Sequence, residues 1–228
     1  MTTPLINPTF VADFSNQEGW FDPDSFTETV TIIGLGGIGG TLIPLISTLG
    51  FRKYVLWEDD VVKPHNMATT TTFLPEHLLQ PKAEVCRDRL YAGGATDVKI
   101  IPRKFTANDD VEGIVISAVD NMTARQEIWQ AVKRSNVQFY LDGRIGGLQF
   151  SLFGVEPFDG EWYEQRWLFD DSQAAPLPCA TRAIAFTAEA LSAYIGAFLV
   201  NWHRGEMPPK RVDVDLGSFF FQAVGRRS

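Results

Sequence analysis

The stretch TVTIIGLGGIGG, residues 29–40, decides the fold. Residues 30–33 are apolar and β-branched, which is typical of a buried strand, and an apolar run with helical character covers residues 38–49. Between them the backbone can approach a phosphate closely, and a helix N-terminus offers free N–H groups and the positive end of its dipole. The stretch therefore predicts a strand, a turn and a helix that bind a nucleotide. The turn is rich in glycine: Gly34, Gly36, Gly37 and Gly39.

The composition is that of an ordinary soluble α/β domain. The chain has 228 residues, 45% hydrophobic and 21% charged. A signal peptide and a membrane span are not expected, so the cytoplasm is the expected location. The net charge of −8 argues against a nucleic-acid partner. Two cysteines, Cys86 and Cys179, can make neither a disulfide framework nor an all-cysteine zinc site, so no structural zinc is expected.

The first 28 residues are expected to form an acidic N-terminal arm, followed by one domain over residues 29–228. The first 50 residues contain no Lys or Arg. The arm either folds over the body or contacts a partner, or it is a loosely attached tail. Its acids are Asp13, Glu18, Asp22, Asp24 and Glu28.

Strands alternate with helices as far as residue 141, which implies a parallel sheet with right-handed crossovers. Beyond it we expect a Gly-rich turn at 143–147, a strand at 148–155, a loop at 156–180 and a long helix at 183–203. The fold class is thus α/β, a Rossmann-like mostly parallel sheet with helices on both faces, continued by an antiparallel C-terminal half. The other expected strands are 54–57, 98–101, 113–119, 137–141, 212–214 and 218–221. The other expected helices are 82–92 and 123–135.

Polar residues follow several of these strands, where an open parallel sheet binds its ligands. Glu58 lies 22 residues after Gly36, where an acid accepts hydrogen bonds from ribose hydroxyls. Lys82 begins a helix and suits phosphate charge, and Asp120 suits a magnesium ion. Together they predict a site for ATP with Mg²⁺, whereas a nicotinamide cofactor would explain only the glycine turn and Glu58.

Residues 29–200 resemble the ThiF/MoeB/HesA adenylating proteins, which are related to the adenylation domains of ubiquitin-activating enzymes. GLGGIG at 34–39 is similar to their nucleotide turn, and EDDVV at 58–62 followed by Asn66 to their D-x-D-x-V…N segment. QPKAE at 80–84 places Lys82 in the catalytic lysine position. AVDN at 118–121, followed by Arg125, resembles their T-D-N…R segment.

The resemblance implies a ThiF-like domain that adenylates a carboxylate. In such a reaction the C-terminal carboxylate of a ubiquitin-like or sulfur-carrier protein, ending in glycine, attacks the α-phosphate of ATP, and the acyl group can pass on to a thiol. A homodimer or pseudo-dimer and a groove for the partner's tail are also implied. The catalytic residues would be Lys82, Asp120 (which also binds the metal) and Cys179, since many members carry a cysteine before the long helix. The nucleotide-binding residues would be Gly34, Gly36, Gly37, Ile38, Gly39, Glu58, Asp60, Asn66, Lys82, Asn121 and Arg125.

The sequence departs from the family pattern at a few positions. Thr69 stands where the family has an arginine that grips the triphosphate, and Glu58 replaces the usual ribose aspartate. The paired zinc CxxC motifs are missing, and no arginine precedes Arg52. By position, Arg144 or Arg182 are the candidates to supply the missing charge.

These departures keep other functions open. The chain is either an active adenylyltransferase or a non-catalytic subunit that binds a nucleotide or a partner. A nicotinamide-dependent oxidoreductase and an enzyme that activates a peptide tail are the remaining alternatives. Cys179 is either a nucleophile, its thiolate favoured by Arg182, or a packing residue. Asp120 also stands where it could cap the next helix.

Overall fold

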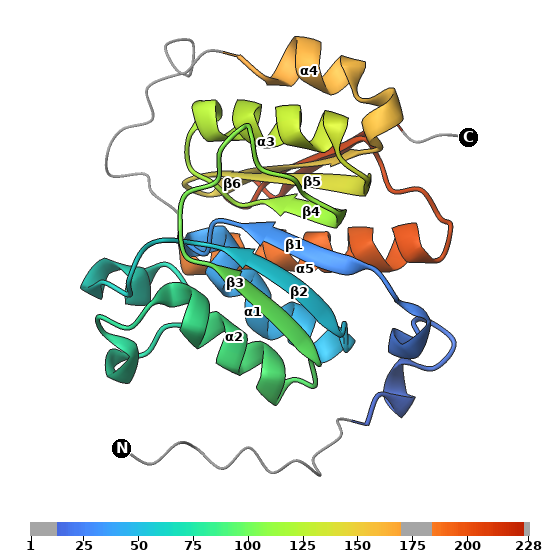
Figure 1. Ribbon diagram of the computed structural model, residues 1–228. Coiled ribbons are helices and arrows are strands. Elements are labelled where there is room, and N and C mark those ends of the chain that lie inside the picture. The colour runs from blue at the N-terminus through green and yellow to red at the C-terminus, as the bar shows by residue number, and fades with distance from the viewer. Residues whose placement is uncertain (1–12, 170–183, 226–228) are drawn as a thin grey trace.

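The computed structural model describes residues 13–169 and 184–225, in which eight strands form one sheet (Figure 1). The order is β3-β2-β1-β4-β5-β6-β7-β8. The first five strands are parallel, and β6 to β8 continue the sheet antiparallel. This confirms the expected fold class. The strands are β1 (Thr29–Ile33), β2 (Lys53–Trp57), β3 (Asp97–Ile101), β4 (Gly113–Ser117), β5 (Val137–Gly146), β6 (Gln149–Val155), β7 (Arg211–Asp215) and β8 (Phe220–Val224).

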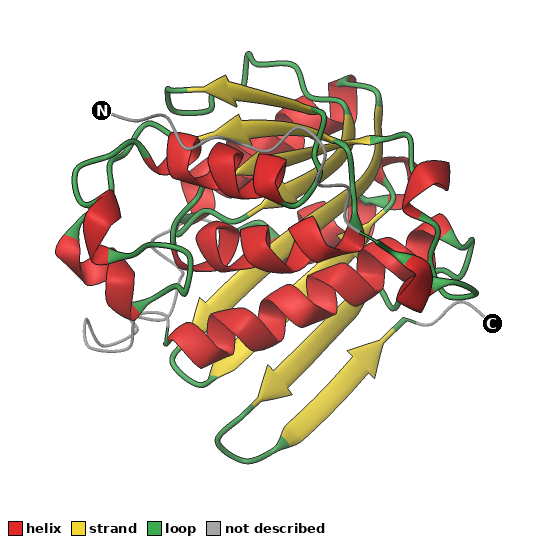
Figure 2. Cartoon of the chain, turned by 90° about the horizontal axis from the view of Figure 1, so that it is seen from below, coloured by secondary structure: helices red, strands yellow, loops and turns green. Residues whose placement is uncertain are grey.

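Helices cover both faces of the sheet. Figure 1 shows α3 and α4 on one side of the strands and α1, α2 and α5 on the other, and Figure 2 views the molecule turned by 90°. Each face has its own buried hydrophobic cluster. Within the described ranges, no helix is both long and apolar enough to cross a membrane. The helices are α1 (Gly37–Leu49), α2 (Lys82–Ala92), α3 (Met122–Arg134), α4 (Glu161–Trp167) and α5 (Ala185–His203).

The central strand and its helix are almost wholly apolar because both are enclosed. Val30 and Ile32 of β1 face the cluster under α1, whereas Ile33 joins the cluster under α3. Helix α1 carries no charged residue and packs beside α5 on the same face of the sheet. Gly196 of α5 allows this approach, since a Cβ there would lie 2.9 Å from Leu45.

The structure corrects several expected boundaries. The expected turn at 143–147 is shorter, because β5 runs to Gly146 and pairs it with Gln149 of β6. The fourth strand ends at Ser117, two residues earlier than expected, and the last strand runs later, over Phe220–Val224.

The expected loop at 156–180 contains α4, because tertiary packing stabilises a helix that its sequence hardly signals. Tyr163 is fully buried in the cluster under α3, with Trp162 and Trp167 packed against that cluster. Trp129 meets the Tyr163 ring edge-on at 5.1 Å. The aromatic residues of this segment therefore anchor α4 on the body.

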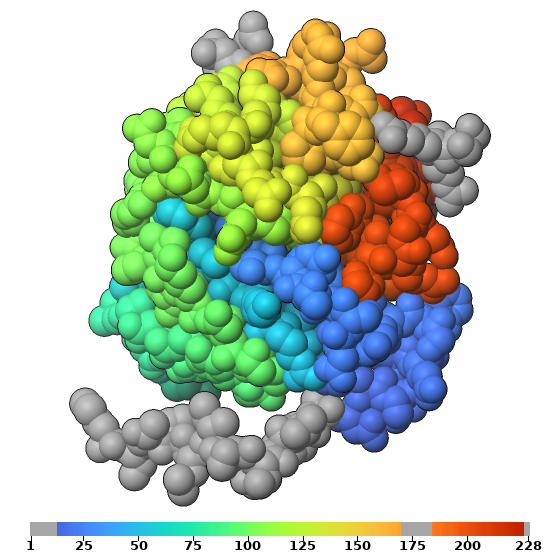
Figure 3. Space-filling view, turned by 45° about the vertical axis from the view of Figure 1, so that its right-hand side comes forward, coloured from blue at the N-terminus to red at the C-terminus, as the bar shows by residue number. Residues whose placement is uncertain are grey.

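The described part of the N-terminal arm packs on the body. Phe21 and Phe26 are buried, and Phe26 stacks on Phe51 at 4.1 Å. The rings of Phe21 and Phe26 also contact His203 at the end of α5. In Figure 3 the blue N-terminal segment lies directly against the orange-red atoms near the C-terminus.

A proline inside α1 explains part of the unusual threonine run at 69–72. Pro44 has no N–H, so it cannot donate the helical hydrogen bond to the carbonyl of Gly40. The Thr72 hydroxyl donates to that carbonyl instead, at 2.6 Å, and the bond is buried. Thr72 thus ties the loop after β2 to the first turns of α1.

We expect Thr72→Val to lower the free energy of unfolding by about 1–3 kcal/mol, because it leaves the Gly40 carbonyl buried without a donor. In a Pro44→Ala background, where residue 44 regains an N–H, the same substitution should cost much less. Urea unfolding of the four proteins measures this coupling. Equal losses in both backgrounds would show that Thr72 does not replace the missing helical bond.

Candidate functional site

The carboxyl ends of three neighbouring strands meet at one edge of the sheet. Ile33 at the end of β1 pairs with Trp57 of β2 on one side and with Ser117 of β4 on the other. The chain leaves β1 toward β2 and β3 on one side, and β4 and β5 lie on the other. In open α/β sheets such a switch in strand order marks the crevice in which ligands bind. The structure therefore brings together the glycine turn and the segments that begin at Glu58 and Ala118.

The glycines of the turn have different roles. Gly34 has a φ of +91°, and a Cβ there would lie 2.9 Å from the carbonyl oxygen of Ala118. A Cβ on Gly39 would lie 1.9 Å from the carbonyl oxygen of Gly34, so this position requires glycine for the helix to pack on the turn. A Cβ on Gly36 would meet nothing within 4 Å. The open side of the turn is therefore at Gly36.

The N-terminus of α1 is suited to an anion. Gly36 is its N-cap, Gly37 its first residue, and Ile38 is buried in the core. Neither a capping side chain nor an acid of its own occupies the first turn. The backbone N–H groups and the dipole there favour a phosphate.

Glu58 braces the glycine turn. One carboxylate oxygen, Oε2, accepts a hydrogen bond from the backbone N–H of Leu35 at 2.8 Å. The other, Oε1, accepts from the N–H groups of Asp59 and Asp60 at 3.1 and 3.0 Å. The residue predicted to hold a ribose thus also fixes the conformation of the turn.

Lys82 is buried beside two carboxylates. Its side chain is 7% exposed, and Nζ lies 3.1 Å from Asp60 Oδ2 and 3.9 Å from Glu58 Oε2. The Lys82 N–H also donates to the Asp60 carbonyl, which joins the start of α2 to the loop after β2. Partial burial raises the pKa of Asp60, but hydrogen bonds from Lys63 and Lys82 outweigh it and hold the pKa at about 2.

Asn66 and Thr69 shape the loop between β2 and α2. Asn66 is buried, and its Oδ1 accepts from the N–H of Lys63 at 2.8 Å. The Thr69 hydroxyl donates to the Asn66 carbonyl at 3.1 Å. Thr69, which the resemblance puts in the place of an arginine, therefore bonds to the local backbone and brings no positive charge.

Asp120 is exposed at the carboxyl end of β4, and its Oδ1 accepts a hydrogen bond from Asn121 Nδ2 at 3.1 Å. It is Asn121 that caps α3, through a bond from the Ala124 N–H at 2.8 Å. No group of three or more potential metal-binding side chains lies in the described part of the chain. A single carboxylate still fits Mg²⁺, which is usually held by one or two carboxylates, water and substrate phosphates.

Arg125 and Arg144 share a buried carboxylate that the sequence analysis missed. Asp142, on β5, is 0% exposed and lies 2.9 Å from Arg125 Nε and 2.7 Å from Arg144 Nε. Arg144, the candidate for the missing charge, also donates to the Trp167 carbonyl, and its guanidinium lies over Phe153. Asp142 follows the strand expected at 137–141, so the strand-end rule that selected Asp120 could have found it.

Of the two cysteines, Cys86 lies in the described part of the chain. Cys86 is fully buried, and burial together with the charge of Glu58 raises the pKa of its thiol. It is a packing residue of α2. Cys179 and Arg182 lie outside the described residues.

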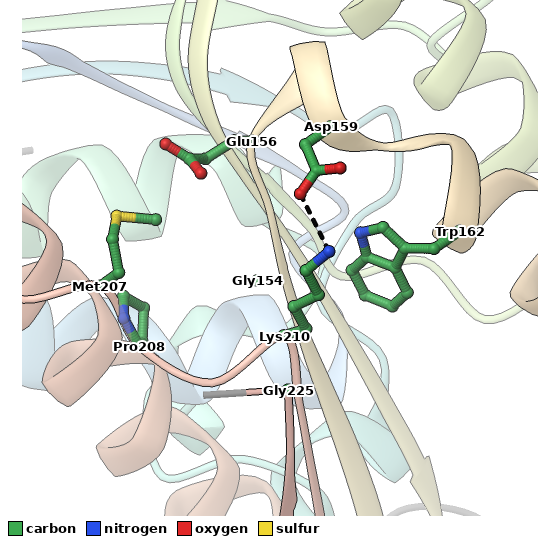
Figure 4. Close-up of a pocket in the computed structure, with 8 residues that line it drawn as sticks. All are labelled: Gly154, Glu156, Asp159, Trp162, Met207, Pro208, Lys210 and Gly225. Atoms are coloured by element: carbon green, nitrogen blue, oxygen red, sulfur yellow. Dashed lines mark hydrogen bonds and ion pairs between the residues drawn. The ribbon is translucent and has the colours of Figure 1, made fainter. Parts of the chain in front are cut away.

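Two cavities lie away from the crevice. One, of about 20 Å³, is beside Lys210, which in Figure 4 points at Asp159 next to Trp162. This cavity is lined by Gly154 and Glu156 at the end of β6. Because β6 runs antiparallel to β5, this end lies at the edge of the sheet opposite to the glycine turn. The cavity is about large enough for one water molecule. The other, a groove of about 420 Å³, lies between α1, α2 and residues 71–80.

Comparison with known proteins gives a family match and similar folds. The model of the ThiF family matches residues 24–215. The structure is similar to E. coli MccB with MccA-N7isoASN (TM-score 0.69, 15% identity, 90% of this chain and 66% of that chain covered). It is also similar to E. coli MccB with ATP (0.67, 15%, 90% and 65%) and to PaaA (0.67, 13%, 88% and 73%). The chain thus spans about two thirds of the length of MccB.

We expect Gly39→Ala to lower the free energy of unfolding by about 3 kcal/mol or more, because its Cβ would overlap the Gly34 carbonyl oxygen. Gly36→Ala should change it by about 0.5 kcal/mol or less, since its Cβ enters open space and its φ is −79°. Urea unfolding measures both. Similar losses in the two variants would contradict this division of roles within the turn.

Proposed function

The chain belongs to the ThiF family, whose members are adenylyltransferase-type enzymes, and from that premise we propose that it adenylates a C-terminal carboxylate with ATP and Mg²⁺. The observation that carries the proposal is the meeting of three features at one crevice. These are the uncapped N-terminus of α1, the buried Lys82 and the exposed Asp120.

The reaction joins the acceptor to AMP. A carboxylate oxygen of the acceptor attacks the α-phosphorus of ATP and forms an acyl–phosphate bond. The bond from the α-phosphorus to the bridging oxygen breaks, and pyrophosphate leaves with the electron pair. The products are an acyl-adenylate and pyrophosphate, and no proton transfer is required when the acceptor is ionised.

Positioning and charge neutralisation supply the catalysis in this proposal. The N–H groups at Gly36 and Gly37 bind phosphate oxygens at the N-terminus of α1. The Lys82 ammonium has three N–H donors, of which Asp60 takes one in this structure, and a phosphate oxygen can take another. Glu58 holds the turn and lies where a ribose hydroxyl can reach it.

The metal has one proposed protein ligand. Asp120 would hold Mg²⁺, together with phosphate oxygens and water. Bound there, Mg²⁺ neutralises negative charge on the triphosphate and on the departing pyrophosphate. Asn121, which hydrogen-bonds Asp120 and caps α3, keeps this carboxylate at the start of the helix.

The proposed acceptor is a ubiquitin-like or sulfur-carrier protein that ends in glycine. Such a terminus is slender and can extend its carboxylate toward the α-phosphate. We further propose that the chain acts as a homodimer and that Cys179 can receive the acyl group. An adduct with the carrier that is reduced by thiols and is lost in Cys179→Ser would support this transfer, and an undiminished adduct would refute it.

A peptide tail is the second candidate acceptor. The likeness in fold to MccB, which was crystallised with MccA-N7isoASN and with ATP, favours it. Both candidates present the same chemistry, a free carboxylate at the end of an extended chain. They differ in whether a folded carrier must dock.

We expect ATP–pyrophosphate exchange that depends on an acceptor, with carriers ending in Gly-Gly and MccA tested side by side. Lys82→Ala and Asp120→Ala should each lower the exchange rate about 100-fold, because the first removes a positive charge beside the phosphates and the second removes the proposed ligand of Mg²⁺. Measuring the incorporation of labelled pyrophosphate into ATP gives the rates.

Lys53→Ala and Asp97→Ala are the matched controls, because these residues begin β2 and β3 at the opposite edge of the sheet. Their exchange rates should stay within about twofold of the wild type. Binding of Mg–ATP without exchange would favour the non-catalytic alternative that Thr69 raises. A calorimetric preference for NAD over Mg–ATP would favour an oxidoreductase, and exchange unchanged by Lys82→Ala would refute the site.

A further inference from the structure

Arg125 is bonded to the protein rather than left open toward the crevice. It lies in the first turn of α3 and is 6% exposed. Its Nε donates to Asp142 Oδ1 at 2.9 Å, and its Nη2 donates to the carbonyls of Val119 and Gly143 at 2.5 and 3.2 Å. Its Nη1 donates to the Asn121 carbonyl at 3.1 Å. The guanidinium thus donates four hydrogen bonds to acceptors of the protein itself.

Two of these bonds flank Asp120. The Val119 carbonyl belongs to the peptide group just before Asp120, and the Asn121 carbonyl to the one just after Asn121. Holding both carbonyls on one rigid guanidinium restricts the backbone between them, and so the direction in which the Asp120 carboxylate points. Asp120 itself is exposed, and the neighbouring Asn121 provides its hydrogen bond.

Asp142 fixes the guanidinium in turn. It is fully buried, and it pairs with Ser117 across β4 and β5, beside the loop that carries Asp120. A buried carboxylate is stable only when it is paired, and Asp142 has Arg125, Arg144 and the Tyr163 hydroxyl as partners. Arg144 and Tyr163 hold Oδ2, which leaves Oδ1 directed at Arg125.

We propose that Arg125 and Asp142 are positioning residues that hold the Asp120 loop in the orientation in which Asp120 binds Mg²⁺ with ATP. This inference rests on the proposed function and changes one part of it. Arg125, which the resemblance implies as a nucleotide-binding residue, acts through Asp120 instead of on the nucleotide. Arginine suits this task because its planar fork reaches a carboxylate and several carbonyls at once, which lysine cannot do.

A double-mutant cycle tests the coupling in the full chain. Arg125→Lys and Asp142→Asn are each made in the wild-type and the Asp120→Asn backgrounds. Two quantities are measured: the Mg²⁺ concentration that gives half-maximal ATP–pyrophosphate exchange, and the Mg²⁺-dependent gain in ATP affinity by calorimetry. A thermal melt of each protein shows that it is folded.

We expect Arg125→Lys to raise the half-maximal Mg²⁺ concentration about tenfold in the wild-type background and to add nothing in Asp120→Asn. Asp142→Asn should behave in the same way, so either variant suffices if the other does not fold. Tyr163→Phe, which removes a hydrogen bond from Asp142 but keeps both ion pairs, should change the Mg²⁺ dependence less than twofold.

Arg134→Lys is the matched control. Arg134 lies at the other end of α3 and also donates to backbone carbonyls, those of Ala107 and Asp109, in a loop remote from Asp120. It should leave the Mg²⁺ dependence unchanged even if it lowers the melting temperature.

Three results would overturn the inference. Equal effects of Arg125→Lys with and without Asp120 would show that Arg125 acts independently of it. A loss of stability with an unchanged Mg²⁺ dependence would show a purely structural role. A wild-type chain with neither exchange nor Mg²⁺-dependent ATP binding would overturn the proposed function as well, whereas the first two results leave that function standing.

Discussion

The carboxylate of Glu58 joins the glycine turn after β1 to the loop after β2. Parallel strands have no hairpin between their carboxyl ends, so the turn after β1 and the loop after β2 are separate segments. Glu58 accepts N–H bonds from both, from Leu35 in the turn and from Asp59 and Asp60 in the loop. The same carboxylate lies 3.9 Å from Lys82, which brings the start of α2 into the arrangement. A charged acceptor makes each of these bonds stronger than a neutral one would.

The two sides of the crevice differ in how their charges are balanced. On the side of β2, Lys82 is shared between Asp60 and Glu58, so a polyphosphate would compete with Asp60 for the ammonium. On the side of β5, two arginines share the single buried carboxylate of Asp142, whereas the carboxylate of Asp120 is exposed.

The packing of helix α1 is also constrained by the glycine turn from which it starts. Helix α1 must begin tightly against its turn, which Gly39 allows, and its apolar residues must pack against the sheet and against the neighbouring α5. Pro44 leaves the Gly40 carbonyl, one turn into the helix, without its helical donor, and Thr72 supplies a hydrogen bond from a distant loop. The threonine run therefore has a structural role at Thr72.

The sequence by itself determined the succession of strands and helices along the chain and the edge of the sheet at which the candidate residues meet. Those features depend on local patterns, such as the β-branched run of β1, the glycines after it and the polar residues that follow each strand. Only the tertiary structure decided that Glu58 faces the Leu35 N–H, that Asp142 holds Arg125, and that aromatic packing stabilises α4. These contacts join residues 17 or more positions apart, and nothing in the local sequence favours one such partner over another. They form because burial excludes water, and each buried polar group must then find a partner within the folded chain.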